Sequence, residues 1–207
     1  MPNTKRYRGC LFWLAGLVGL TLCILFVVVA AQESDEAFLE TLRAEIIPAE
    51  GDETAYAIQL SLHSLPQFIE WWRTLVPLVE EDPRYRGALG ALAAPCCDDN
   101  TAFRCCCEKG GQSCNIVRSG KGLAAHLIRD LDFEMAEIQA SVLEWFRFAR
   151  SDYYLAAELE TRGYDADNYG LTTHGSCYRQ MCNTPISQGG CGGMAELIEP
   201  AIESADG

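Results

Sequence analysis

Nine of the eleven cysteines of this chain lie in two short stretches, and this clustering constrains the fold more than any other feature of the sequence. The first stretch reads PCCDDNTAFRCCCEKGGQSC and holds Cys96, Cys97, Cys105, Cys106, Cys107 and Cys114. The second reads HGSCYRQMCNTPISQGGCGGM and holds Cys177, Cys182 and Cys191. Neither stretch contains a C-x-x-C pair or a common ferredoxin spacing, so the sequence lacks the signatures of thioredoxins, zinc ribbons and c-type haem attachment.

One explanation for the clustering is a disulfide framework. Thiols outside the cytoplasm usually oxidise, and the resulting disulfides hold small domains together. An odd number of cysteines, however, leaves one thiol over or one that pairs between chains. Adjacent cysteines also do not reach good disulfide geometry without strain, so Cys105, Cys106 and Cys107 would need partners in different directions.

The other explanation is a thiolate metal site. Soft sulfur ligands select copper(I), zinc or an iron–sulfur cluster, and we place copper(I) or zinc before a cluster because no ferredoxin spacing occurs. His174, a loop histidine close to the second stretch, joins the nine cysteines as a candidate ligand. Asp98 and Asp99 would add harder ligands for zinc, whereas Met181 and Met194 suit copper(I) better. Glycines in both stretches let the backbone wrap closely around such an ion.

An apolar run over residues 11–31 predicts a membrane helix. Its length at about 1.5 Å per residue spans roughly 30 Å of hydrocarbon. Basic residues precede the run, within residues 1–10, and acidic residues follow it. This asymmetry predicts a cytoplasmic N-terminus and an extracytoplasmic domain over residues 32–207. The alternative is a cleaved signal peptide, but the run exceeds the usual apolar core of one, about 7–15 residues. We therefore expect a single-pass membrane protein held in the bilayer by residues 11–31.

The charge and the motifs argue against two classes of function. The chain has 16 basic and 29 acidic residues and a formal net charge of −13, whereas nucleic-acid binding needs a concentrated basic face. A Cys–His nucleophile pair requires one thiol singled out by a general base, and no spacing here singles one out. The Glu-x-x-His pattern of di-iron bundles does not occur on the predicted helices either. We expect neither nucleic-acid binding nor catalysis, with thiol redox activity as the remaining exception.

The rest of the chain predicts a mainly α-helical domain. Caps and apolar periodicity indicate helices over residues 34–47, 67–81, 84–94 and 153–162. The clearest pattern runs from Ala124 to Ala149 in steps of four and three, which predicts one long helix over residues 123–150.

Three further segments depart from the long helices. Residues 56–62 alternate between apolar and polar, which predicts a short strand or an extended segment. Residues 164–193 have the composition of a loop, and residues 195–204 form a last amphipathic turn or two. We expect the two cysteine-bearing loops to meet.

The first stretch also resembles a known family. The order of a helix, then Pro95-Cys96-Cys97, then further cysteines and a polar Cys114-Asn115, is similar to exported bacterial proteins named for a PCYCGC motif. Members of that family are membrane-attached, cysteine-rich and of unassigned function, and the resemblance implies the same for this chain. The motif here reads PCCDDN, so no ligand role is carried across.

These observations leave two hypotheses. In the first, a membrane-anchored extracytoplasmic protein binds a soft metal ion through clustered thiolates, as a metal sensor, carrier or resistance component. In the second, a disulfide-stapled helical interaction domain serves as an accessory subunit of an envelope or membrane-protein complex. The acidic domain and the single anchor suit both.

Overall fold

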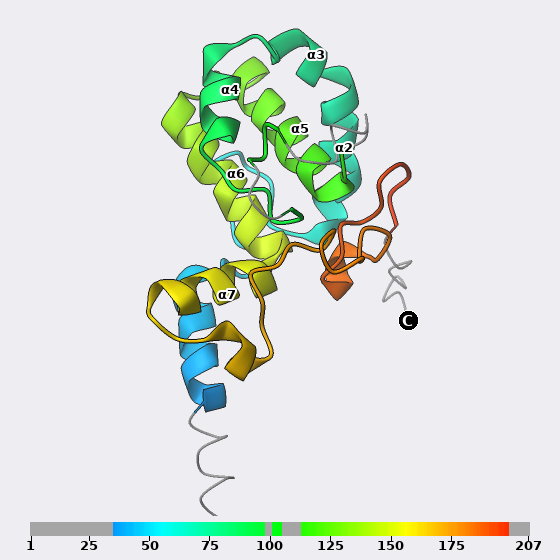
Figure 1. Ribbon diagram of the computed structural model, residues 1–207. Helices are drawn as coiled ribbons and strands as arrows, with labels where there is room; N and C mark the ends of the chain where they lie inside the picture. Colours follow the sequence, from blue (N-terminus) through cyan, green and yellow to red (C-terminus); the bar gives the residue numbers. More distant parts are fainter. Residues whose placement is uncertain (1–34, 98–100, 105–112, 199–207) are drawn as a thin grey trace, which may run out of the picture. The chain divides into compact units, whose positions relative to one another are not determined.

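The computed structural model describes residues 35–97, 101–104 and 113–198 (Figure 1). The predicted flank at 1–10, the predicted membrane helix at 11–31 and Cys105, Cys106 and Cys107 lie outside these ranges. Within them, none of the helices combines the length and the apolar character that a bilayer crossing requires. The chain divides into two compact units, Met1–Leu42 and Arg43–Gly207, and everything below concerns the second unit unless stated.

The described residues are mainly helical, which confirms the mainly α-helical domain but does not test the predicted membrane helix before it. They contain no β-strand and only two isolated antiparallel bridges, Glu53 with Gln59 and Ala93 with Thr101. A first helix covers residues 35–46, across the boundary between the units, where a helix was predicted. The α-helices that follow are α2 (Leu65–Thr74), α3 (Val76–Val79), α4 (Pro83–Gly90), α5 (Asn115–Arg129), α6 (Met135–Ala149) and α7 (Ser151–Thr161). Short 3-10 helices are η1 (Leu62–Ser64), η3 (Ala166–Tyr169) and η4 (Ile186–Gln188).

Helix α5 is the centre of the core, because it contacts α2, α3, α4 and α6 (Figure 1). Two glycines permit this close packing. A Cβ on Gly122 would lie 1.8 Å from the carbonyl oxygen of Phe68 in α2, and a Cβ on Gly120 would lie 2.3 Å from the ring of Phe146 in α6. The buried Trp145 of α6 also donates from its indole nitrogen to Ser119 at 2.8 Å. The backbone of α2 and the Phe146 ring of α6 therefore approach α5 closely at its two glycines.

The prediction of one helix over residues 123–150 was wrong, because two helices share that apolar pattern. α5 begins eight residues earlier than predicted and ends at Arg129, and α6 begins at Met135. Between them Asp132 takes a positive φ of 52°, which aspartate tolerates better than most residues. Glu134 and Glu137 then form a capping box that starts α6. The break leaves Leu131 and Met135 partly exposed.

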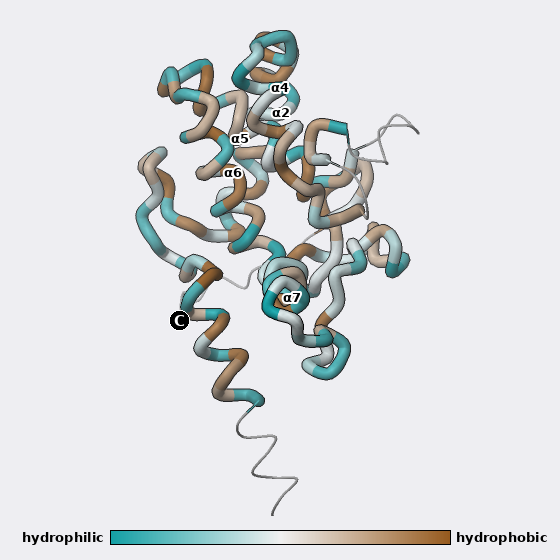
Figure 2. The backbone as a smooth tube through the Cα atoms, turned by 60° about the vertical axis from the view of Figure 1, so that its left-hand side comes forward, coloured by the Kyte–Doolittle hydropathy of each residue, from teal (hydrophilic) through white to brown (hydrophobic). Residues whose placement is uncertain are grey.

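Most of the predicted apolar seam is nevertheless buried. Ala124 and Ile128 on α5, and Ile138, Val142 and Trp145 on α6, lie in the core. The periodicity therefore identified the correct faces although it spanned a turn. Figure 2 shows hydrophobic and hydrophilic residues alternating along these helices, as expected of helices with one buried face.

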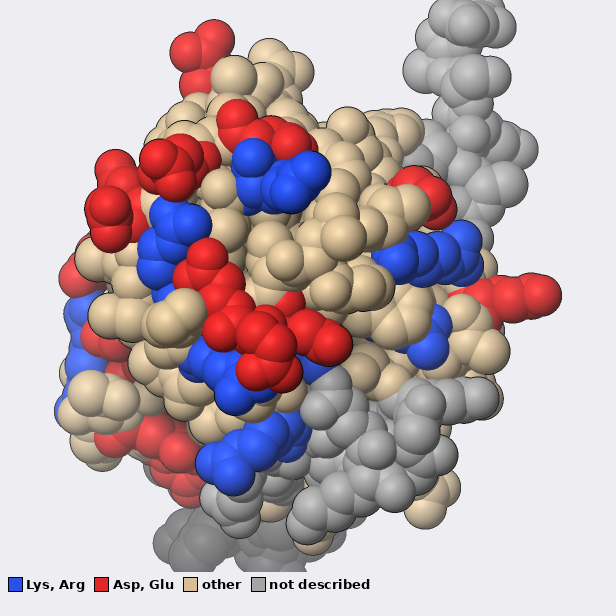
Figure 3. Space-filling model, turned by 90° about the horizontal axis from the view of Figure 1, so that it is seen from above, with Lys and Arg blue, Asp and Glu red and all other residues tan. Residues whose placement is uncertain are grey.

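Other predictions hold in part. The strand or extended segment predicted over 56–62 is not one continuous element: Tyr56 and Ala57 lie in a turn, with Ala57 at a positive φ of 59°, and Leu62 begins η1. Tyr56 and Leu60 are buried. Pro77 interrupts the second predicted helix, and α3 follows α2 after Leu75. The amphipathic turn predicted at 195–204 is absent from its described part, residues 195–198, which has no helix. On the face drawn in Figure 3, acidic and basic side chains lie interspersed.

Candidate metal centre

The first cysteine stretch begins at the end of α4. After Gly90 the chain turns so that the amide of Ala102 donates to the carbonyl of Leu92 at 2.8 Å and the amide of Cys97 donates to Ala94 at 3.1 Å. Leu92 and Ala94 are buried. These apolar anchors fix Cys96 and Cys97 in the core, both almost fully buried.

The last cysteine of that stretch, Cys114, is the N-cap residue of α5. The first amides of a helix lack partners within the helix, and here the second cysteine stretch supplies them. Asn115 donates from its amide to the carbonyl of Gly193 at 3.0 Å, and Ile116 donates to the carbonyl of Cys191 at 3.2 Å. The second stretch therefore caps the central helix, although about seventy-five residues separate the two.

A second backbone contact joins the two stretches. The amide of Cys177 donates to the carbonyl of Cys96 at 2.9 Å. Just before it, Gly175 packs so closely that a Cβ there would lie 2.5 Å from the amide nitrogen of Cys97. The prediction that the two cysteine loops meet is confirmed for their described residues.

The contact brings six sulfur atoms together, and five of them form two overlapping groups, with Cys97 outside both. One group consists of Cys96, Cys114 and Cys191, and the other of Cys177, Cys182 and Cys191. Within each group all Sγ atoms lie within 4.8 Å of one another. Sulfur atoms at the corners of a tetrahedral zinc–thiolate site lie roughly 3.8 Å apart, from a metal–sulfur bond of about 2.3 Å. Each group is therefore compact enough for one ion to contact its three sulfur atoms, although one pair in each group, at 2.7 and 3.0 Å, lies closer than this spacing.

The sulfur distances do not correspond to disulfides. The nearest pairs are Cys182 with Cys177 at 2.7 Å, Cys114 with Cys96 at 3.0 Å, Cys96 with Cys97 at 3.5 Å and Cys177 with Cys191 at 3.6 Å. A disulfide bond is about 2.05 Å long. No pair among the six described cysteines is at bonding distance, and none of the six forms a disulfide.

The centre has a buried side and a partly exposed side. Cys96, Cys114 and Cys191 are buried, whereas Cys177 and Cys182 are half-buried. Burial raises the pKa of the Cys182 thiol. Hydrogen bonds from Cys114, Cys177 and Cys96, with the nearby charge of Arg150, hold the pKa of the Cys191 thiol well below its usual range. The positive end of the α5 dipole, where Cys114 lies, also favours thiolates.

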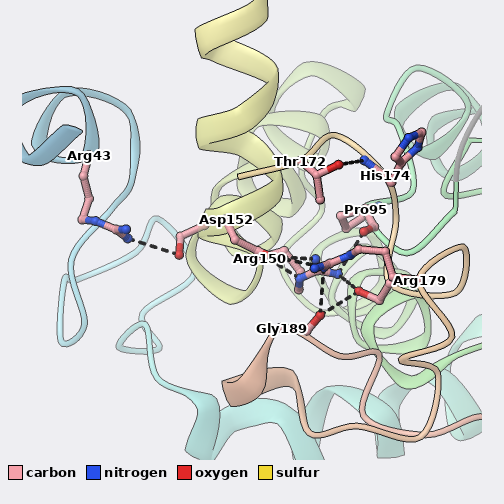
Figure 4. A network of polar contacts seen from close by, with 10 residues as sticks. Arg43, Pro95, Arg150, Asp152, Thr172, His174, Arg179 and Gly189 are labelled. Atoms are coloured by element: carbon pink, nitrogen blue, oxygen red, sulfur yellow. Dashed lines mark hydrogen bonds and ion pairs between the residues drawn. The ribbon is translucent and has the colours of Figure 1, made fainter. Parts of the chain in front are cut away.

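Arg150 connects both cysteine loops to the end of α6 (Figure 4). Its side chain is completely buried. It donates to the carbonyl of Pro95, directly before Cys96, at 2.9 Å, and to the hydroxyl of Ser176, directly before Cys177. Asp152, in the first turn of α7, accepts its remaining hydrogen bonds at 3.1–3.2 Å. The Arg150 guanidinium thus binds Pro95 and Ser176, the residues directly before the first cysteine of each stretch.

A second buried arginine lies four residues after Cys114. Arg118, in the first turn of α5, donates to the carbonyls of Met194 and Ala195, both at 2.8 Å, and to the side-chain oxygen of Asn115 at 3.1 Å. These acceptors are neutral. Burial lowers the pKa of Arg118, and the negative charge of the Cys114 thiolate opposes that effect. The side chain also lies over the ring of Trp72, 4.5 Å from its centroid.

The predicted ligands divide into three sets. Five of the predicted cysteines form the two sulfur groups with Cys97 beside them, and Cys105, Cys106 and Cys107 lie outside the described residues. His174 is exposed and stacks on Tyr178 at 4.4 Å between centroids, and it belongs to neither sulfur group. The sequence did not point to Arg118, Arg150 or Gly175.

The chain was compared with protein-family models, with curated proteins and with solved structures, and none of the three comparisons gives a match.

Proposed function

We propose that this protein binds a soft metal ion through the thiolates of its two cysteine stretches, at the outer face of a membrane to which residues 11–31 anchor it. The observation that carries the proposal is the convergence of five Sγ atoms in two groups, each compact enough to contact one ion, without a pair at disulfide length. Thiolate ligands select soft ions such as copper(I) and zinc.

The two buried arginines support a charged centre over a neutral one. Several thiolates around one ion carry more negative charge than the ion neutralises, and a buried charge needs a compensating partner. Arg118 supplies positive charge beside Cys114, and Arg150, which also pairs with Asp152, supplies it beside Cys191. Three disulfides in the same place would be neutral and would leave Arg118, whose hydrogen-bond acceptors are neutral, without a thiolate partner.

The partly exposed side of the centre favours carriage or sensing over a purely structural role. Cys177 and Cys182 are half-buried, so an ion enters and leaves through them without unfolding of the core. The ion would also join the two loops, because its ligands come from both. Binding of the ion would therefore order the surface of the second loop, and a membrane partner would bind to that ordered surface.

Metal analysis and thiol counting on the full chain, purified without reductant, test the proposal. We expect bound copper or zinc, and thiols that react with a probe only after a chelator removes the metal. The absence of metal together with loss of thiol titre to oxidation would contradict the proposal and would favour the disulfide-stapled interaction domain instead.

A further inference from the structure

We propose that the centre holds two metal ions rather than one, that the Cys191 thiolate bridges them, and that both ions are copper(I). This inference rests on the proposed function, since it specifies the ion and the number of ions at the same site. It starts from the overlap of the two sulfur groups, which share Cys191.

A single ion does not account for both groups. Two sulfur atoms bound to one ion lie at most roughly 4.6 Å apart, twice a bond of about 2.3 Å. The three Sγ atoms of each group lie within 4.8 Å of one another, but the five sulfur atoms do not form one group at that limit. One ion therefore fits each group, and the sulfur atom common to both, that of Cys191, contacts both ions.

The number of ligands distinguishes the ions. Among the described residues, each group offers three thiolates, whereas zinc in closed protein sites takes four ligands in a tetrahedron. Copper(I) is a soft ion with which thiolates bind strongly, and three thiolates complete its coordination. Cys97 belongs to neither group, although its Sγ lies 3.5 Å from that of Cys96.

The test is a copper(I) titration of the reduced full chain in detergent, without oxygen and against a chromogenic copper(I) chelator. The readout is the number of ions lost relative to the parent chain, so that cysteines elsewhere do not affect it. We expect Cys114→Ser and Cys182→Ser to lose one ion each and Cys191→Ser to lose two. Cys97→Ser, the matched control for a buried cysteine beside the centre, should lose none.

Three outcomes would overturn the inference. If all three ligand variants lose the same single ion, the centre is mononuclear and the proposed function survives alone. If Cys191→Ser loses only one ion, the bridge is wrong. If the parent chain binds no copper(I) and no zinc, the proposed function fails as well. Should Cys191→Ser unfold by circular dichroism, X-ray absorption of the copper-loaded parent decides: copper–copper scattering supports the bridged pair, and its absence refutes it.

Discussion

Replacing Arg150 by methionine tests whether one buried guanidinium holds the two cysteine loops together. The variant keeps the length of the side chain and removes its hydrogen bonds to Pro95 and Ser176. Each buried hydrogen bond from a charged donor contributes about 1.5–3 kcal/mol. The ion pair with Asp152 adds at most about 1 kcal/mol, because the Asp152 side chain is 34% exposed. We expect the free energy of unfolding to fall by roughly 3–6 kcal/mol, a large part of the 5–15 kcal/mol typical of a domain.

The assay is urea denaturation of the reduced, metal-free full chain, followed by tryptophan fluorescence. Arg162→Met is the matched control, because Arg162 pairs with Glu45 and Glu158 at 2.6 and 2.7 Å but lies at the surface. It should leave the midpoint of unfolding nearly unchanged. Arg150→Met should also weaken metal binding about 10–100-fold, as expected when a group that orients ligands is lost. Equal shifts of the midpoint in the two variants would refute the role assigned to Arg150.

Three further predictions follow from the fold and the centre. Gly175→Ala places a Cβ 2.5 Å from the backbone of the first loop, so it should lower metal content, whereas Gly90→Ala, which has open space around it, should not; equal metal content in both would contradict the loop contact. Ile138→Asp should lower the free energy of unfolding by several kcal/mol, because it buries a charge. Ala140→Asp on the exposed face of α6 should lower it by less than about 1 kcal/mol. Comparable losses in the two variants, measured by denaturation, would show that the α6 faces are misassigned. Lowering the pH should release the metal, because thiolate ligands must be deprotonated. Cys182, whose pKa burial raises, should protonate first. A metal content independent of pH between neutral and mildly acidic buffer would argue against thiolate ligation.

The meeting of the two cysteine loops was predictable from the sequence, since a polar, glycine-rich second loop needs an external anchor to order it. The start of α5 was not. Gly120 and Gly122 lower helix propensity, and Arg118 and Lys121 interrupt the apolar pattern, so the sequence indicated a helix only from residue 123. The glycines belong there because Phe68 and Phe146 pack where a side chain would otherwise lie. That reason depends on residues far away in the sequence.

The turn between α5 and α6 was hidden for a different reason. The apolar residues on its two sides remain in phase, so periodicity alone does not distinguish one helix from two. Asp132 and the Glu134–Glu137 capping box mark the break in the structure. The S/T-x-x-E form of that box is easier to recognise in a sequence than the glutamate form found here.

The role of Arg150 in joining the two cysteine loops was also not predictable from the sequence. An arginine at the end of a helix is ordinarily a surface cation that interacts with the helix dipole. No residue next to Arg150 in the sequence indicates which groups accept its hydrogen bonds. Pro95 and Ser176 become its neighbours only when the two cysteine loops meet at the end of α6.

Intact-mass spectrometry of the full chain, purified without reductant, tests the central claim most directly. The protein is measured once under native conditions and once after acid and a chelator. A thiolate metal centre predicts a native mass that includes bound metal. It also predicts a denatured mass in which every thiol hydrogen is present on the six described cysteines, Cys96, Cys97, Cys114, Cys177, Cys182 and Cys191. A metal-free native mass, with a denatured chain that lacks two hydrogens for each pair of these cysteines, would show a disulfide framework and contradict the account.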